Sequence, residues 1–169
     1  MNPLGWLVGL VLPACGFAAA DGLPTPSLAD VARIVRPSSP NTALAAPDGF
    51  APQPGPARSA PPIDIITPHY QIPAERLFAL IRDVAGSQPR TWQAALYPGQ
   101  FQAHYVARSA IFNFPDRVVV QVERDGPDSS LLIMYSGSVY GRSDFGMNRR
   151  RVETWLAALQ TKLPSSSER

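Results

Sequence analysis

Apolar and polar positions repeat regularly between Ile63 and Leu163, and the repeat has two different periods. Four segments have the alternation or the β-branched and aromatic content that predicts strands. These segments are Ile63 to Ile66, Phe101 to Phe114, Val118 to Val122 and Leu131 to Tyr140. Turn residues separate the last three, because Pro115-Asp116 and Asp125-Gly126-Pro127-Asp128 favour breaks in extended structure.

Two further segments repeat at helical spacing. Pro73 opens the first and Gly86 is its predicted C-terminal stop. Asp144 directly precedes the second and is predicted to be its structural N-terminal cap, with the helix starting at Phe145. The apolar faces of the two helices are Leu77, Phe78, Leu80, Ile81 and Val84, and Phe145, Val152, Trp155, Leu156 and Leu159. The order of elements predicts an α+β fold, in which an antiparallel sheet of about four strands carries two helices on one face.

The stretch before this domain has a different composition, because 14 of the 19 prolines lie at or before Pro73. Residues 21–62 are predicted to be a Pro/Ala-rich segment and linker, since such a sequence cannot hold a long helix or a central strand. Ser27 to Val35 has the spacing of one short helix, and Ala45 to Pro62 is expected to be extended, either solvated or lying as a strap on the domain. The single domain then covers 63–163, and 164–169 is a predicted disordered tail.

The first 20 residues have the features of an export signal. An apolar core from Leu4 to Leu12 is followed by Leu12-Pro13-Ala14-Cys15, which resembles the lipobox of bacterial lipoproteins and makes Cys15 the candidate lipidation site. Ala18-Ala19-Ala20 is an alternative cleavage signal that would release a soluble periplasmic protein, and an uncleaved signal anchor is a third alternative. We therefore expect an exported domain on the periplasmic side of the envelope, tethered to the membrane by a lipid anchor.

Charge and composition argue against several kinds of partner. All but one of the 15 basic residues are arginines, and outside Arg149 to Arg151 charges of both signs are interspersed, so no nucleic-acid partner is expected. His69 and His104 lie far apart without cysteine or carboxylate spacing around them, so neither a metal site nor another cofactor is predicted. With Cys15 as the only cysteine, the domain also has no disulfide.

The richest polar chemistry lies where the last predicted strand meets the last helix. Arg142, Asn148, Arg149 and Arg151 are the candidate ligand-binding residues, because a helix N-terminus beside arginines suits a carboxylate or phosphate. The competing interpretation is a polar network that locks strand to helix, with Asn148 bonding the strand end at Ser136 to Ser138. Arg142 is the residue expected to reach an anionic group, and Gly137 is expected to leave open space beside it.

Several of these motifs together resemble the DUF1499 family of bacterial proteins of unknown function. The resemblance covers about Val35 to Leu163 and is carried by Phe112-Asn113-Phe114-Pro115-Asp116, Tyr135-Ser136-x-Ser138 and Gly141-Arg142-Ser143-Asp144-Phe145-Gly146-Met147-Asn148-Arg149-Arg150-Arg151. Gly137 stands where the family commonly has arginine. The resemblance implies a small exported protein or lipoprotein, and it implies no reaction.

The leading functional hypothesis is a binding module without catalytic machinery, which takes an anionic ligand at the junction or an apolar one between the sheet and the C-terminal helix. A serine hydrolase centred on Ser143 is the first alternative. Its Gly141-to-Phe145 turn lacks the second glycine of a nucleophile elbow, and it would need His69 or His104 as base. The second alternative is a structural protein-interaction domain anchored by exposed Trp92, Tyr97 or Tyr140.

Overall fold

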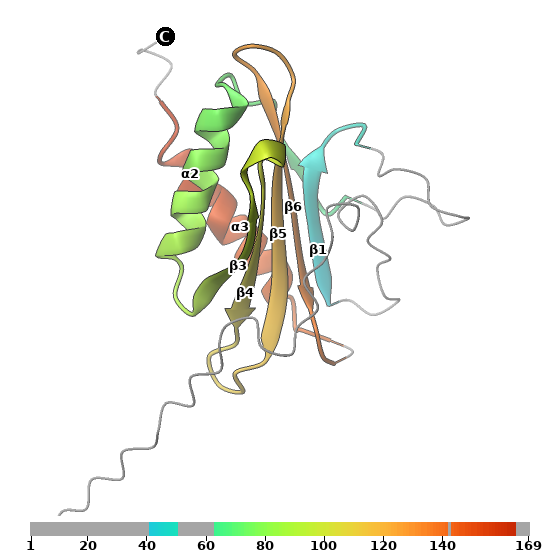
Figure 1. Ribbon diagram of the computed structural model, residues 1–169. Coiled ribbons are helices and arrows are strands. Elements are labelled where there is room, and N and C mark those ends of the chain that lie inside the picture. Colours follow the sequence, from blue (N-terminus) through green and yellow to red (C-terminus); the bar gives the residue numbers. More distant parts are fainter. Residues whose placement is uncertain (1–40, 51–62, 142, 165–169) are drawn as a thin grey trace, which may run out of the picture.

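The computed structural model describes residues 41–50, 63–141 and 143–164. These residues form two layers, a twisted sheet and a pair of helices that cover one of its faces (Figure 1). In chain order the elements are β1 (Thr42–Pro47), β2 (Ile65–Thr67), α2 (Ala74–Ser87), β3 (Thr91–Tyr97), the 3-10 helix η1 (Pro98–Gln100), β4 (Gln102–Arg108), β5 (Pro115–Arg124), β6 (Ser130–Ser138) and α3 (Met147–Gln160). The expected export signal, the lipidation site Cys15, the short helix near Ser27 and Arg142 lie outside the described residues.

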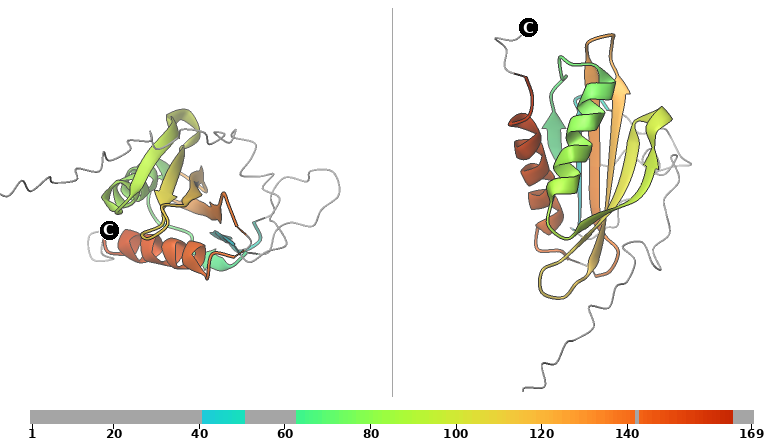
Figure 2. Two further views of the ribbon diagram at one scale, coloured as in Figure 1. Left: turned by 90° about the horizontal axis from the view of Figure 1, so that it is seen from below. Right: turned by 60° about the vertical axis from the view of Figure 1, so that its left-hand side comes forward.

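The sheet has six strands in the order β2-β1-β6-β5-β4-β3 (Figures 1 and 2). Neighbouring strands are antiparallel except β1 and β2, which are parallel. The predicted α+β class with two helices is therefore confirmed, whereas the expected sheet of about four antiparallel strands is wrong in its count and in its purely antiparallel pairing.

Strand β1 lies wholly within residues 21–62, the predicted Pro/Ala-rich segment and linker, so the folded part extends N-terminal of the expected boundary at residue 63. Its sequence is mostly alanine, and Ala43 and Ala45 are fully buried under the helices while Leu44 and Ala46 are buried on the opposite face. Small side chains allow α3 to pack close to this strand, and they also remove the strong β-branched signal of a strand. Pro47 is its last residue, where a missing N–H costs little.

The predicted strand Phe101 to Phe114 is shorter in the structure, because β4 ends at Arg108. Residues 109–114 form a loop in which Asn113 adopts the left-handed backbone region at φ 55°. The loop is closed by Ser109, whose N–H donates to Phe114 O at 2.9 Å and whose Oγ accepts from Phe114 N at 3.0 Å. Strand β5 then begins at Pro115 itself, a first strand position that a proline tolerates.

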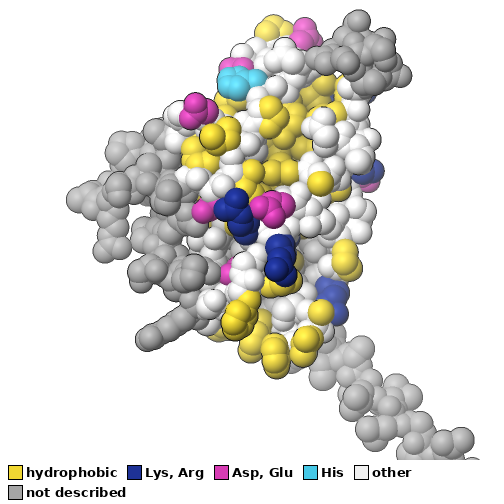
Figure 3. Space-filling view, turned by 180° about the vertical axis from the view of Figure 1, so that it is seen from behind, with side chains coloured by type: hydrophobic (Ala, Val, Ile, Leu, Met, Phe, Trp, Pro, Cys, Tyr) yellow, Lys and Arg dark blue, Asp and Glu magenta, His cyan; other side chains and the backbone are white. Residues whose placement is uncertain are grey.

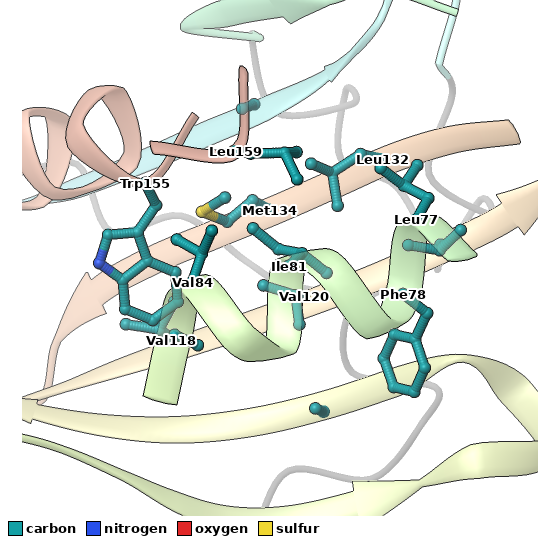
Figure 4. Close-up of a cluster of buried hydrophobic side chains, with 14 of the residues drawn as sticks. Leu77, Phe78, Ile81, Val84, Val118, Val120, Leu132, Met134, Trp155 and Leu159 are labelled. Carbon is teal, nitrogen blue, oxygen red and sulfur yellow. The ribbon is translucent and has the colours of Figure 1, made fainter. Parts of the chain in front are cut away.

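The main core lies between the helices and the sheet (Figure 4). One face of α2 contributes Leu77, Ile81 and Val84, which are fully buried. Trp155 of α3 is 1% exposed, and its ring meets that of Tyr105 edge to face with centroids 5.7 Å apart. The sheet contributes side chains that fill the space between its face and the helices: Val118, Val120, Leu132 and Met134.

The opposite face of the sheet carries a smaller buried cluster of Leu44, Ala46, Val119, Ile133 and Tyr135. Tyr135 lies directly over Gly137, two residues further along the same strand, so a Cβ atom at position 137 would collide with the tyrosine ring and hydroxyl. The expected open space at Gly137 is therefore wrong, because Tyr135 fills it. An arginine at this position would require a different orientation of Tyr135.

Trp155→Ala tests whether the side chains between the helices and the sheet are close-packed around Trp155. We expect the free energy of unfolding to fall by about 3–5 kcal/mol, because the truncation leaves a cavity that the two helices cannot close. The control is Trp92→Ala, since Trp92 is 44% exposed on β3 and its loss should cost less than about 1 kcal/mol. Chemical denaturation of both variants measures the difference, and equal losses would show that the core does not depend on Trp155.

Candidate functional site

Helix α3 starts two residues later than the sequence predicts. Gly146 precedes it in the left-handed backbone region, with φ 78°, and Met147 is the first helical residue. Asp144 nevertheless binds the helix start, because its Oδ1 accepts from Gly146 N at 3.0 Å and its Oδ2 accepts from Asn148 N at 2.8 Å. A carboxylate on these amides leaves little room for an external anion at the same helix end.

Asn148 is the hub of the polar residues at this junction and is completely buried. Its Nδ2 group donates to the backbone oxygen of Asn41 at 2.9 Å, to Ser138 Oγ at 3.0 Å and to Asp144 Oδ2 at 2.7 Å. Its Oδ1 accepts from Ser136 Oγ at 2.6 Å. One side chain of α3 thus bonds the start of β1, the end of β6 and the loop between β6 and α3.

Arg151, one helical turn further along α3, forms an ion pair with Asp116 at the start of β5. One guanidinium nitrogen donates to Asp116 Oδ2 at 2.7 Å, and the other donates to Ser136 Oγ at 2.9 Å and Asn148 Oδ1 at 2.7 Å. Only 12% of the Arg151 side chain and 8% of the Asp116 side chain are exposed. The planar fork of arginine allows one residue to serve the ion pair and the hub together.

We call Asn41, Asp116, Ser136, Ser138, Asp144, Asn148 and Arg151 the junction network. Its hydrogen bonds run mainly among its own members, so most of its polar capacity is used inside the protein. One buried acceptor differs: Asn41 Oδ1 has no hydrogen-bond partner among the described residues, although Asn41 Nδ2 donates to Gly141 O at 3.0 Å. These contacts hold the start of α3 against the ends of three strands, and we call this arrangement a structural lock.

The structure brings together only part of the predicted ligand-binding set. Asn148 and Arg151 meet in the junction network, whereas Arg149 is exposed and pairs with Glu153 one turn along the helix at 2.9 Å. Arg149 therefore does not converge on the site with them. The structure does not describe Arg142, so its expected contact with an anionic group stays a prediction.

Sequence reasoning missed two members of the network, Asp116 and Asn41. The signal for Asp116 was available, because it is in the same alternation phase as Val118, Val120 and Val122, which all face the helices. An acidic residue in a buried row must find a cation, and Arg151 is that cation. Asn41 gave no such signal, since it follows Pro40 in a segment that reads as a turn.

Ser143 has no histidine beside it in the described part of the chain. Its Oγ accepts from Phe145 N at 3.3 Å, a local turn contact. His69 lies beyond the opposite end of β6, and the nine residues of that strand span about 30 Å. There the His69 ring bonds Asp125 at 2.8 Å and lowers the pKa of the Asp125 carboxyl group. His104 is buried on the sheet face away from the helices, with its Nε2 3.1 Å from Gln102 Oε1.

The aromatic residues considered for protein interaction differ in exposure. Trp92 and Tyr140 are exposed, whereas Tyr97 is half-buried against the His104 ring at a centroid distance of 5.2 Å. Within the residues that the structure describes, no three His, Cys, Asp or Glu side chains gather as metal ligands. In the same residues, neither helix is long and apolar enough to cross a membrane.

Comparison with known proteins identifies the family. The DUF1499 family, described as proteins of unknown function, matches residues 35–159, and this chain belongs to it. No curated protein matches the chain. Among solved structures, a solution NMR structure of a protein from Thermobifida fusca is similar at 12% identity and a TM-score of 0.39, covering 56% of this chain and 88% of that one.

Arg151→Lys tests the junction network, because lysine keeps the charge and loses the fork that reaches Asp116 and Asn148 together. We expect a loss of about 1–3 kcal/mol in the free energy of unfolding.

Asp116→Asn should lower the free energy of unfolding by about 3 kcal/mol or more, since it leaves the Arg151 guanidinium buried without a counter-charge. Both are measured by chemical denaturation.

The matched control is Arg149→Lys, the same substitution two residues away in the same helix. Its exposed pair with Glu153 should contribute about 0.5 kcal/mol or less. If Arg149→Lys and Arg151→Lys unfold at the same denaturant concentration as the unmodified protein, the network does not hold the fold together.

Proposed function

We propose that this protein is an exported, membrane-tethered domain of the cell envelope that acts by binding and carries out no chemistry. The observation that carries the proposal is the closed junction network. Two of the four candidate ligand-binding residues, Asn148 and Arg151, are bonded within this network and join α3 to β1, β5 and β6. They therefore serve the scaffold, and the function falls to surfaces of that scaffold.

The arrangement of the remaining polar groups supports a role without catalysis. A hydrolase centred on Ser143 would need a general base within hydrogen-bond reach, about 3 Å. In the described residues Ser143 bonds only a nearby backbone amide, and both histidines are bonded elsewhere in the fold. Nothing in the site therefore favours acyl-transfer chemistry over binding.

The interior also argues for a surface role. A ligand between the sheet and the C-terminal helix would have to displace Trp155, Leu132 and Met134, which fill that space (Figure 4). Each is nearly or fully buried, and protein interiors of this kind are close-packed. We therefore place the proposed partner outside the core, where an apolar or anionic group can contact exposed side chains.

The support for export and tethering comes from the N-terminal sequence. Leu4 to Leu12 and the following Leu12-Pro13-Ala14-Cys15 provide an apolar core and an acylation site in the order that lipoprotein signals require. One acyl-carrying cysteine in a chain without other cysteines also leaves no competing thiol.

The proposal predicts that labelled palmitate enters the protein in its own host and that Cys15→Ser abolishes the incorporation. The unmodified protein should fractionate with membranes. The matched control is Ser27→Ala, a similarly small change downstream of both cleavage signals, which should label normally.

Two other results would be informative. Unlabelled protein with Asp21 as its mature N-terminus would remove the lipid tether and keep export. Recovery of the chain from the cytosol with Met1 intact would contradict both parts of the proposal.

A further inference from the structure

The exposed apolar side chains of this domain are concentrated at one end of the sheet. Among the described residues nine large hydrophobic side chains are exposed, and seven of them come from two neighbouring segments, 111–114 and 139–147. We call these seven the apolar tip. They are Ile111, Phe112, Phe114, Val139, Tyr140, Phe145 and Met147. The side chain of Phe145 is 90% exposed and that of Ile111 is 85% exposed. Groups of large hydrophobic side chains with such high exposure are rare on protein surfaces that face only water.

The two segments are held side by side by the sheet. Asp116 pairs with Ser138 in the register of β5 and β6, and Val139 N donates to Pro115 O at 3.2 Å. The loop from β4 to β5 and the loop from β6 to α3 therefore leave the sheet at the same end. Figure 3 shows hydrophobic side chains gathered along this lower end of the molecule. The surface is a protruding end formed by two loops.

Side-chain contacts hold the loop from β4 to β5 in place. Arg90, just before β3, donates to Ser109 O, and Arg108 donates to Asn113 O at 3.0 Å. Phe112 and Phe114 stack on each other with ring centroids 5.6 Å apart. The exposed aromatic rings are thus presented on a braced loop, so little conformational entropy remains to be lost when they are buried.

The charge around the apolar tip is positive. Arg90, Arg108 and Arg150 lie at this end and have no carboxylate partner among the described residues. Two carboxylates at this end are already bonded, since Asp116 pairs with Arg151 and Asp144 binds the helix start. The opposite end has a different character, with exposed Asp125 and Asp128 in the turn between β5 and β6.

The chain also enters the described fold at this end. Asn41 precedes β1, and its backbone oxygen accepts from Ser138 N at 3.1 Å, beside the loop from β6 to α3. A tether attached before residue 41 therefore joins the described fold beside the apolar tip.

From these observations we infer that the apolar tip docks into the surface of an anionic lipid bilayer, with its aromatic and aliphatic side chains in the interface and its arginines on lipid headgroups. The inference rests on the proposed tether for its biological setting. Aromatic rings flanked by cations suit the boundary between headgroups and acyl chains. A protruding end whose arginines have no carboxylate partner among the described residues fits an anionic bilayer surface better than a second copy of this chain, whose tip would carry the same charge.

The test uses the full 169-residue chain with Cys15→Ser, so that an added cysteine is the only thiol. One variant carries Phe145→Cys and the other Asp128→Cys at the opposite end, each labelled with an environment-sensitive nitrobenzoxadiazole group. Vesicles of phosphatidylethanolamine and phosphatidylglycerol are added. We expect the label at position 145 to shift to shorter wavelength with a several-fold rise in intensity, and to be quenched by nitroxide lipids, while the label at 128 stays unchanged.

This local signal separates docking from tethering. If the N-terminal export signal alone holds the chain on vesicles, the protein sediments with the vesicles and the fluorescence of neither label changes, which overturns the inference. Changes at both labels would show that the tip is not the docking end and would also overturn it. A shift at 145 that needs no lipid and grows with protein concentration would assign the tip to self-association instead. A chain found in the cytosol of its host would defeat the proposed tether and leave this vesicle result unaffected.

A second pair of variants tests the apolar contribution in the Phe145→Cys chain. Phe112→Asp should raise the lipid concentration for half-maximal shift roughly tenfold or more, because an aromatic side chain that enters the bilayer on docking is replaced by a charge. Ile66→Asp is the control, since Ile66 is 66% exposed on β2, away from the tip, and should leave the curve in place. Equal effects of the two substitutions would overturn the inference, and circular dichroism checks that both variants fold.

Discussion

The buried ion pair between Arg151 and Asp116 sets the constraint on which this fold depends. A charge that is nearly removed from water needs a partner and hydrogen bonds, and Asn148 and Ser136 provide the bonds. The pair fixes the start of β5 to α3, and the hub residue then fixes β1 and β6 to the same helix. Because its first turns are held in this way, α3 packs its apolar face against the sheet in one position.

This lock also explains how the two loops at the same end are presented. Because Asn148 bonds Asp144 and Ser138, the loop from β6 to α3 is held at both of its ends. The loop from β4 to β5 ends where β5 begins, at Pro115, one residue before Asp116. The ion pair of Asp116 with Arg151 therefore also fixes the end of this loop. Buried polar groups thus fix the positions of exposed apolar ones, and the scaffold and the proposed docking surface depend on the same contacts.

The sequence predicts the helices and the two longest strands well, because Leu77, Ile81 and Trp155 recur at helical spacing and Val118, Val120 and Val122 alternate. It does not reveal β1, where alanines beside prolines have no strand signal, or β3, whose apolar and polar residues do not alternate. At the site, Asn148 and Arg151 could be found from their place at the helix start. Helical spacing indicates that Arg149 and Arg151 point in different directions, but only the structure shows that Arg151 faces Asp116 and that Arg149 faces Glu153.

The most direct test of the lock is hydrogen exchange of the Asn148 side-chain amide, followed by NMR. A closed network predicts that its Nδ2 protons exchange only when the whole domain unfolds, as slowly as the most protected backbone amides of β6. The exposed side chain of Asn113 provides the reference for fast exchange. If the Asn148 amide exchanges as fast as that of Asn113, the junction is open to solvent and available to a ligand, and the account of a structural lock is wrong.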